Sequence, residues 1–232
     1  MAEARDRLIV ALDFADVATA RAFVEQVGDS VTFYKVGLEL VLNGGLDLVR
    51  ALKGEGKRVF LDMKLLDIPN TVEKAVANAA RTGADFLTIH AIDTKTIEAA
   101  ATGAAGSDLK VLGVTVLTSL DQSDLAEQGI AAATPGDLVI MRARLAKAAG
   151  CHGVIASGQE AAAVRAATGE GFLIVTPGIR LPSDAVGDQA RVATPGTAIA
   201  DGATHLVVGR PITQAADPRA AADAFVQAIA TA

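Results

Sequence analysis

Eight short runs rich in Val, Ile and Leu recur along this chain of 232 residues, and Ala-rich stretches separate them. The runs are LIVALD (8–13), FYKVG (33–37), RVFLDMK (58–64), FLTIHA (86–91), KVLGVTVLT (110–118), GVIAS (153–157), FLIVTPG (172–178) and HLVVGR (205–210). Near-continuous hydrophobicity without strict alternation is typical of parallel strands that are covered on both faces of a sheet.

The stretches between the runs have helical spacing. DVATARAFVEQVGD (16–29) and DPRAAADAFVQAIA (217–230) both begin at an Asp, as helix N-caps do, and others stop at a Gly. Strand followed by helix eight times, with no linker and no shift in composition, predicts an α/β protein: a single (β/α)8 TIM barrel domain over residues 1–232. A doubly wound open sheet is the alternative, because periodicity alone does not distinguish a closed sheet from an open one. The long gap from 119 to 152 predicts an extra helix around DQSDLAEQGI.

Composition excludes several classes of partner and compartment. A formal net charge of -6 disfavours a nucleic-acid partner, because proteins that bind polyanions usually carry a basic face. The single cysteine, Cys151, rules out an intrachain disulfide. The start of the chain, MAEARDRLIVALD, fits neither a signal nor a transit peptide, and no segment reaches the roughly 18 apolar residues of a membrane span. We therefore expect a soluble cytoplasmic protein that binds neither nucleic acid nor membrane.

Polar side chains follow the predicted strands at the ends where barrel enzymes carry their active sites. These residues are Asp13, Lys35, Asp62, Lys64, Thr118 and, after Gly209, Arg210. Their position predicts one site at the carboxyl end of the barrel.

The most informative stretch is LDMKLLDIPNTV (61–72). Asp62 and Lys64 are two residues apart, so on a strand their side chains point to the same side, where Asp13 and Lys35 from neighbouring strands could join them. Asp67 comes after the strand, in a loop stiffened by a proline. One interpretation is a structural salt bridge at the barrel mouth. Four charges of alternating sign favour a functional site instead, because desolvating each ion costs several kcal/mol.

Three segments could bind a phosphate group: VTPGIR (175–180), GDQ (187–189) and VVGRP (207–211). Loops after the seventh and eighth strands of barrels commonly bind phosphate through backbone N–H groups and Arg. Taken singly, each Gly is as well explained by a turn and each Arg by a solvated surface charge. Their convergence on adjacent strand ends favours the phosphate site.

Seven blocks of sequence, in order, carry a resemblance to a known family. They are ALD (11–13), YKVG (34–37), LDMKLLDIPNTV (61–72), VTVLTS (114–119), TPGIR (176–180), GDQ (187–189) and VVGRPIT (207–213). Over nearly its whole length the chain resembles the bacterial orotidine 5'-phosphate decarboxylases. The resemblance implies decarboxylation of orotidine 5'-monophosphate to uridine 5'-monophosphate in pyrimidine biosynthesis, without a cofactor or a metal.

The resemblance also implies residue roles. Lys64 would be the proton donor, and Asp62, Lys35 and Asp67 would complete the catalytic array. The substrate-binding residues would be Asp13 and Lys35 for the ribose hydroxyls, Thr118 for the pyrimidine, Arg180, Gln189, Gly209 and Arg210 for the 5'-phosphate, together with Ile68 and Thr71. A lid from about Leu181 to Ala193 would close over the nucleotide.

A homodimer is implied as well, because Asp67 and Thr71 would reach into the active site of the other subunit and make two composite sites. Two other functions stay open. Magnesium-dependent sugar-phosphate decarboxylases and aldolases share the D-x-K-x-x-D pattern, but they resemble this chain less because they have a Glu, a metal ligand, where it has Lys35. A nucleotide-binding barrel without catalysis is the other.

Overall fold

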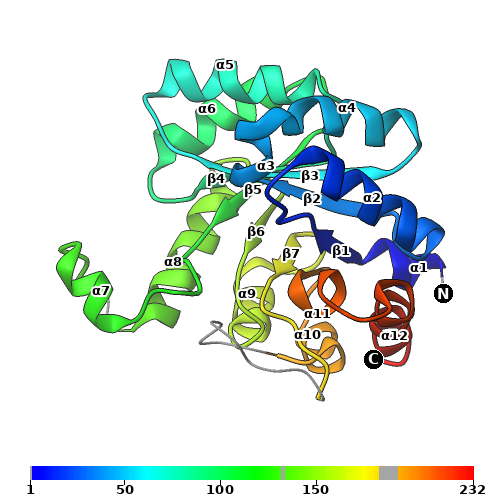
Figure 1. Ribbon diagram of the computed structural model, residues 1–232. Coiled ribbons are helices and arrows are strands. Elements are labelled where there is room, and N and C mark those ends of the chain that lie inside the picture. Colours follow the sequence, from blue (N-terminus) through cyan, green and yellow to red (C-terminus); the bar gives the residue numbers. More distant parts are fainter. Residues whose placement is uncertain (1, 132–133, 183–192) are drawn as a thin grey trace.

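The computed structural model describes residues 2–131, 134–182 and 193–232, and in it eight parallel strands form a closed barrel (Figure 1). The strands are β1 (Leu8–Ala11), β2 (Phe33–Gly37), β3 (Arg58–Leu65), β4 (Phe86–His90), β5 (Lys110–Val114), β6 (Gly153–Ile155), β7 (Leu173–Thr176) and β8 (His205–Val208). Each strand pairs with the next one in sequence, and β8 pairs with β1. The predicted (β/α)8 barrel is confirmed, and the open sheet is wrong because the first and last strands are joined.

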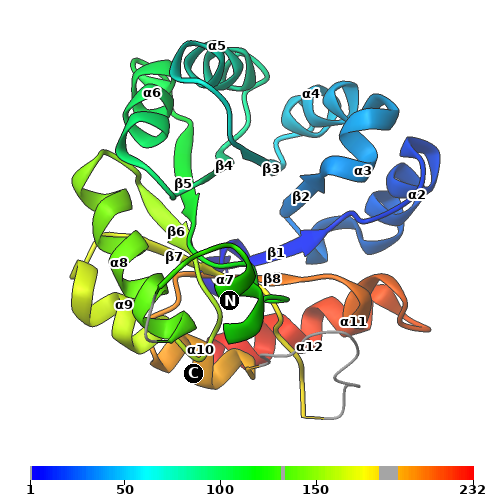
Figure 2. The same cartoon turned by 90° about the vertical axis from the view of Figure 1, so that its left-hand side faces the viewer.

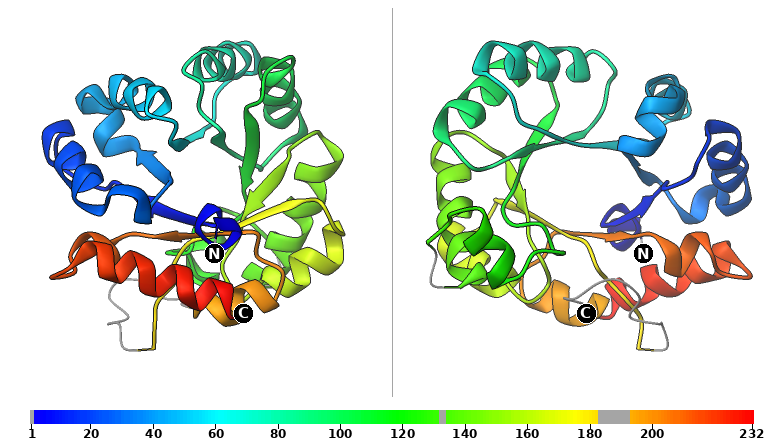
Figure 3. Two further views of the ribbon diagram at one scale, coloured as in Figure 1. Left: turned by 90° about the vertical axis from the view of Figure 1, so that its right-hand side faces the viewer. Right: turned by 60° about the vertical axis from the view of Figure 1, so that its left-hand side comes forward.

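Most of the helices surround the barrel as an outer ring, which Figures 2 and 3 show from several sides, while the short helix at the start of the chain lies across one end of the barrel. The helices of the described residues are α1 (Ala2–Asp6), α2 (Val17–Val27), α3 (Leu38–Leu40), α4 (Leu46–Gly54), α5 (Pro69–Ala80), α6 (Thr94–Ala104), α7 (Gln122–Glu127), α8 (Pro135–Ala148), α9 (Ala161–Thr168), α10 (Pro195–Ala200), α11 (Arg210–Thr213) and α12 (Pro218–Ala230), with the shorter turns η1 (Gly28–Ser30) and η2 (Val41–Gly45). The extra helix predicted between β5 and α8 is α7, which extends beyond the ring (Figure 1).

The helices begin where the sequence places capping residues. The side chain of Asp16 accepts a hydrogen bond from the backbone N–H of Thr19 at 2.8 Å, and Asp217 does the same for Ala220 at 3.0 Å. Proline occupies the first turn of α5, α8, α10 and α12, where its missing N–H has no intrahelical partner to lose. Each such cap stabilises its helix by about 1 kcal/mol.

The strands are apolar on both faces because each face meets a different core. The outward residues pack against the helices, while the inward residues fill the barrel itself. The inner set is Ile9, Ala11, Phe33, Phe60, Phe86, Leu112, Val175 and Val207. A barrel of this kind is packed throughout, so a cavity can form only at its ends.

The rings of Phe33, Phe60 and Phe86 pack together inside the barrel, directly below the polar side chains at its carboxyl end. Phe86 contacts Phe33 and Phe60 with ring centroids 5.1 and 6.1 Å apart, and the guanidinium of Arg58 covers Phe33 from below at 4.1 Å. Side chains two residues further along a strand point the same way, one layer nearer its carboxyl end. The layer above these rings therefore consists of Lys35 in β2, Asp62 in β3 and Thr88 in β4.

Several strands end earlier than the apolar runs predict. β5 ends at Val114 rather than near Thr118, because its neighbour β6 ends at Ile155 and offers no further ladder. The backbone N–H and the hydroxyl of Thr115 both use the carbonyl of Ile155, and the chain then leaves the sheet. Thr118 thus lies in the loop above the strand rather than on it.

Among the described residues, no helix combines the length and the apolar character needed to cross a membrane.

Candidate active site

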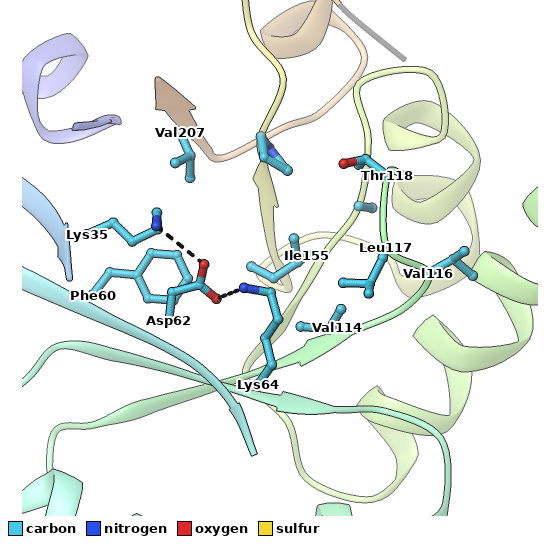
Figure 4. Close-up of a pocket in the computed structure, with 12 residues that line it drawn as sticks. Lys35, Phe60, Asp62, Lys64, Val114, Val116, Leu117, Thr118, Ile155 and Val207 are labelled. Carbon is cyan, nitrogen blue, oxygen red and sulfur yellow. Dashed lines mark ion pairs between the residues drawn. The ribbon is translucent and has the colours of Figure 1, made fainter. Parts of the chain in front are cut away.

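Two adjoining cavities open at the carboxyl end of the barrel. The first, of about 180 Å³, has Lys35, Asp62 and Lys64 on one side and an apolar wall on the other (Figure 4). The second, of about 400 Å³, is lined by polar groups that include Asp13, Arg180 and Arg210. Lys35, Pro177 and Val207 line both cavities, so the two form one continuous site.

The four charges of alternating sign form one connected array. Lys35 Nζ donates to Asp13 Oδ1 at 2.8 Å and lies 3.6 Å from Asp62 Oδ2. The other oxygen of that carboxylate, Oδ1, lies 2.8 Å from Lys64 Nζ, and Figure 4 marks both ion pairs of Asp62. Each of the four charged groups is therefore paired with at least one group of opposite charge.

Asp62 stays ionised although it is buried. Only 14% of its side chain is exposed, and burial alone, the largest single effect, raises the pKa of the carboxyl. The charges of Lys35 and Lys64 and hydrogen bonds from Lys64 and Thr88 together outweigh it and hold the pKa of Asp62 below its ordinary value. A permanent negative charge thus lies beside the ammonium of Lys64.

Gly37, the last residue of the YKVG block, leaves room for this array. A Cβ at this position would lie 3.0 Å from Lys35 Nζ and 3.5 Å from Asp13 Oδ1. Such a carbon would crowd the ammonium against its carboxylate partner, so the glycine preserves the contact between β2 and the loop after β1.

Lys64 reaches the cavity through an irregular strand. From Leu61 to Leu65 β3 advances by four residues, while the paired segment of β4 from Leu87 to Ile89 advances by two, so β3 carries a bulge. Within the bulge Lys64 has φ of 50°, and it is the one non-glycine residue with positive φ in the described part of the chain. A left-handed backbone costs a residue with a Cβ about 1–2 kcal/mol, a cost that marks the position as constrained by its surroundings.

His90 ends β4 beside this site. Burial, followed by the positive charges of Lys64 and Arg142, lowers the pKa of its imidazole from the ordinary value. The ring is therefore neutral near pH 7, and it adds no further cation to the array.

The second cavity brings together residues from the ends of β7 and β8. Arg180 and Gly178 come from the loop after β7, while Gly209 and Arg210 follow β8. They belong to two of the three predicted phosphate-binding segments, 175–180 and 207–211, which lie at adjacent strand ends. Gln189 and most of the predicted lid, residues 183–192, lie outside the described residues.

Three predicted site residues do not line the cavities of their own chain. Asp67, Ile68 and Thr71 are exposed, and Asp67 Oδ1 accepts a hydrogen bond from the backbone N–H of Ile68 at 2.6 Å. They face outward from the loop after β3 and the start of α5.

The apolar wall and one polar residue of the site were not predicted from the sequence. Val116 and Leu117 come from the loop after β5, and Ile155 comes from β6; nothing in their composition separates them from ordinary core residues. Thr88, fully buried in β4, bonds both Asp62 and the backbone of Lys64. The sequence offered one indication of this role: Thr88 is a hydroxyl residue in the largely apolar run FLTIHA, on the strand that follows the D-x-K motif.

Comparison with known proteins connects this geometry to a family. A family model described as Orotidine 5'-phosphate decarboxylase / HUMPS family matches residues 6–225. A protein of Cereibacter sphaeroides named orotidine 5'-phosphate decarboxylase is 57% identical over 221 residues, which are 94% of this chain and 95% of the relative. A protein of the same name from Rhodopseudomonas palustris (strain BisA53) is 54% identical over 227 residues, 98% of this chain and 96% of the relative.

The similarity extends to solved structures. The crystal structure of orotidine 5'-phosphate decarboxylase from Lactobacillus acidophilus superposes with a TM-score of 0.86 at 37% identity, and the match covers 96% of this chain and 98% of that one. Fold, motif order and near full-length identity agree, so this chain is an enzyme, a carboxy-lyase, and belongs to the Orotidine 5'-phosphate decarboxylase / HUMPS family.

Proposed function

We propose that the enzyme converts orotidine 5'-monophosphate to uridine 5'-monophosphate, in pyrimidine biosynthesis, by electrostatics alone. The observation that carries this proposal is the ammonium of Lys64, which lies 2.8 Å from the buried carboxylate of Asp62 and faces an apolar wall. The names of the relatives at 54% and 57% identity support this substrate for this chain.

The reaction breaks the bond between carbon 6 of the pyrimidine and its carboxylate carbon. Carbon dioxide leaves, and the electron pair of that bond stays on carbon 6, where no adjacent carbonyl can spread it as an enolate. The protein must therefore stabilise the carbanion, and a preorganised charge in a site shielded from water does this well. Lys64 Nζ stabilises the lone pair and then transfers a proton to carbon 6, which leaves a neutral amine that solvent protonates again.

Asp62 has two effects on this step. Its carboxylate forms an ion pair with the Lys64 ammonium at 2.8 Å, and the charged form of that side chain is the one that can stabilise the anion and protonate it. It also repels the substrate carboxylate: two like charges about 4 Å apart interact by roughly 4 kcal/mol at an effective dielectric constant of 20. Movement or proton sharing reduces this repulsion, so we assign the larger share of the rate to carbanion stabilisation.

The two cavities divide the nucleotide between them. The pyrimidine occupies the first, within reach of Thr118, and the 5'-phosphate occupies the second, where Arg180, Gly209 and Arg210 bind it. The ribose lies at their boundary, because Lys35 lines both cavities and its partner Asp13 lines the second. Binding energy at the phosphate is then used to fix the ring against Lys64.

A homodimer completes the site in this proposal. Asp67, Ile68 and Thr71 are exposed in the single chain, and Ile68 and Leu66 leave 67% and 50% of their surfaces in solvent. Together with the exposed Ile92 they offer apolar surface beside the mouth, as an interface between subunits requires. In the dimer, Asp67 and Thr71 contribute to the partner subunit's site.

The magnesium-dependent rival fits this geometry less well. The ammonium of Lys35 lies 2.8 Å from Asp13 and 3.6 Å from Asp62, and a cation at that place opposes the binding of a second one.

The proposed cytoplasmic location is supported by the one cysteine, which is free and buried as reducing compartments allow.

An absorbance assay tests the function. Adding the protein to orotidine 5'-monophosphate should remove the absorbance of the orotate ring at the same rate with and without EDTA. Loss of activity in EDTA would favour the magnesium-dependent rival. Binding of the nucleotide without turnover would favour a non-catalytic barrel.

A further inference from the structure

Thr88 connects the two central residues of the charged array. It is fully buried in β4, its Oγ1 accepts a hydrogen bond from the backbone N–H of Lys64 at 2.9 Å, and its hydroxyl donates to Asp62 Oδ1 at 2.9 Å. We propose that Thr88 is a positioning residue for the decarboxylation, because a single hydroxyl fixes both the backbone that carries the proton donor and the carboxylate beside it. This inference rests on the proposed function.

The stereochemistry of threonine suits this double contact. One hydroxyl has a single proton to give and lone pairs to accept with, so it satisfies a carboxylate and an N–H at the same time. The branched Cβ restricts rotation about χ1, which fixes the hydroxyl in one direction. Asp62 Oδ1 also contacts Lys64 Nζ, so Thr88, Asp62 and Lys64 close a ring of contacts around the bulge.

The bulge in β3 explains why such a residue is needed. Two extra residues in β3 interrupt its ladder with β4 between Leu61 and Leu65, and Lys64 lies within that interruption with a left-handed backbone. Its N–H takes the side chain of Thr88 as acceptor. Without the hydroxyl, this N–H loses that partner and the strained backbone of Lys64 loses a contact that holds it.

The hydroxyl also acts on the charge of Asp62. A hydrogen bond donated to a carboxylate favours its ionised form. The other groups that face Asp62 are Lys35 from β2, Lys64 from β3 itself and His90 at the end of β4, and Asp13 lies beyond Lys35. Removing the hydroxyl should therefore shift the titration of Asp62 to higher pH while these neighbours stay in place.

Two substitutions at this position separate the hydroxyl from the shape of the side chain. Thr88→Val keeps the shape and removes both hydrogen bonds, whereas Thr88→Ser keeps the hydroxyl and removes a methyl group. Thr168→Val is the matched control: Thr168 is equally buried, but its hydroxyl bonds the carbonyl of Val164 within α9, away from the mouth. For each variant kcat, KM, the pH profile of kcat and the dissociation constant of uridine 5'-monophosphate are measured.

Thr88→Val should lower kcat by about tenfold or more and change product binding by less than about threefold, since the contact is made to catalytic groups rather than to the nucleotide. The acidic limb of its kcat profile should move to higher pH. Thr88→Ser should recover most of kcat and the original limb, and Thr168→Val should match the wild type in both.

Crystal structures of the two Thr88 variants supply a readout that does not depend on turnover. In Thr88→Val the φ angle of Lys64 should leave the left-handed region, and in Thr88→Ser it should remain there. A Thr88→Val enzyme with wild-type kcat, an unmoved acidic limb and Lys64 still at positive φ would overturn the inference while the proposed function stands. A wild-type protein that does not decarboxylate the nucleotide would instead overturn the proposed function. The φ angle of Lys64 in the variant structures would then still show whether Thr88 positions the backbone of Lys64.

Discussion

Lys64 Nζ and Asp62 Oδ1 lie 2.8 Å apart. Both residues belong to β3, in the part of the strand where a bulge interrupts the regular pairing with β4. A regular strand would already point both side chains inward, but the bulge also gives Lys64 a left-handed backbone, φ 50°, that a residue with a Cβ adopts only at a cost. The fold thus accepts local strain at the residue to which we assign proton transfer. Stability given up at one position is a common property of catalytic sites.

Arg210→Ala should lower kcat/KM for orotidine 5'-monophosphate by roughly 10- to 100-fold, because it removes a charged hydrogen-bond donor from the phosphate cavity. The effect should disappear with orotidine, the nucleoside that lacks the phosphate. Arg50→Ala is the control, since Arg50 is a surface residue of α4 that pairs with Asp47. Equal losses on the two substrates would mean that Arg210 does not bind the phosphate.

Composite sites make a prediction about mixed dimers. Lys64→Ala and Asp67→Ala should each be inactive as purified homodimers. After the two are unfolded and refolded together, half of the dimers should be mixed, and each mixed dimer should hold one intact site. The mixture should therefore recover about a quarter of the wild-type activity. A mixture as inactive as its components would show that Lys64 and Asp67 act within one chain.

His205 should make the fold sensitive to mild acid. Burial, and then the charges of Arg58 and Arg7, lower the pKa of this imidazole to about 3 in the folded state, against about 6.5 in an unfolded chain. Above pH 6.5 both states are neutral and the group contributes nothing. As the pH falls below 6.5 the unfolded chain binds a proton that the folded chain refuses, so stability is lost.

Denaturant unfolding between pH 6.5 and pH 5 measures this effect. The free energy of unfolding of the wild type should fall by about 1 kcal/mol per pH unit from this group, and the slope should be shallower in His205→Gln. Identical slopes for the two proteins would contradict the assignment.

The sequence was informative wherever chemistry depends on residue type at a strand end. Asp13, Lys35, Asp62 and Lys64 were predicted to meet because parallel strands present their carboxyl ends at one edge, and their ion pairs connect all four. Eight repeats of an apolar run followed by a helix predicted the (β/α)8 barrel, but the closure of the sheet is shown only by the pairing of β8 with β1.

The parts that could not be predicted depend on pairing between segments distant in sequence. The bulge in β3 is defined only by the register with β4, so neither the backbone of Lys64 nor the role of Thr88 can be seen in the motif alone. The apolar wall is similar: Leu117 and Ile155 resemble core residues, and only the early end of β5 directs that loop over the cavity.

Lys64→Ala measures how far decarboxylation depends on the ammonium that β3 carries into the cavity. Its matched control is Lys53→Ala, because Lys53 pairs with Asp85 at 2.7 Å and its side chain is 27% exposed, against 31% for Lys64. Decarboxylation and binding of uridine 5'-monophosphate are measured for both. We expect Lys64→Ala to lower kcat by about a thousandfold or more with product binding retained, while Lys53→Ala keeps wild-type turnover. A Lys64→Ala enzyme that decarboxylates within a few fold of the wild-type rate would contradict this expectation.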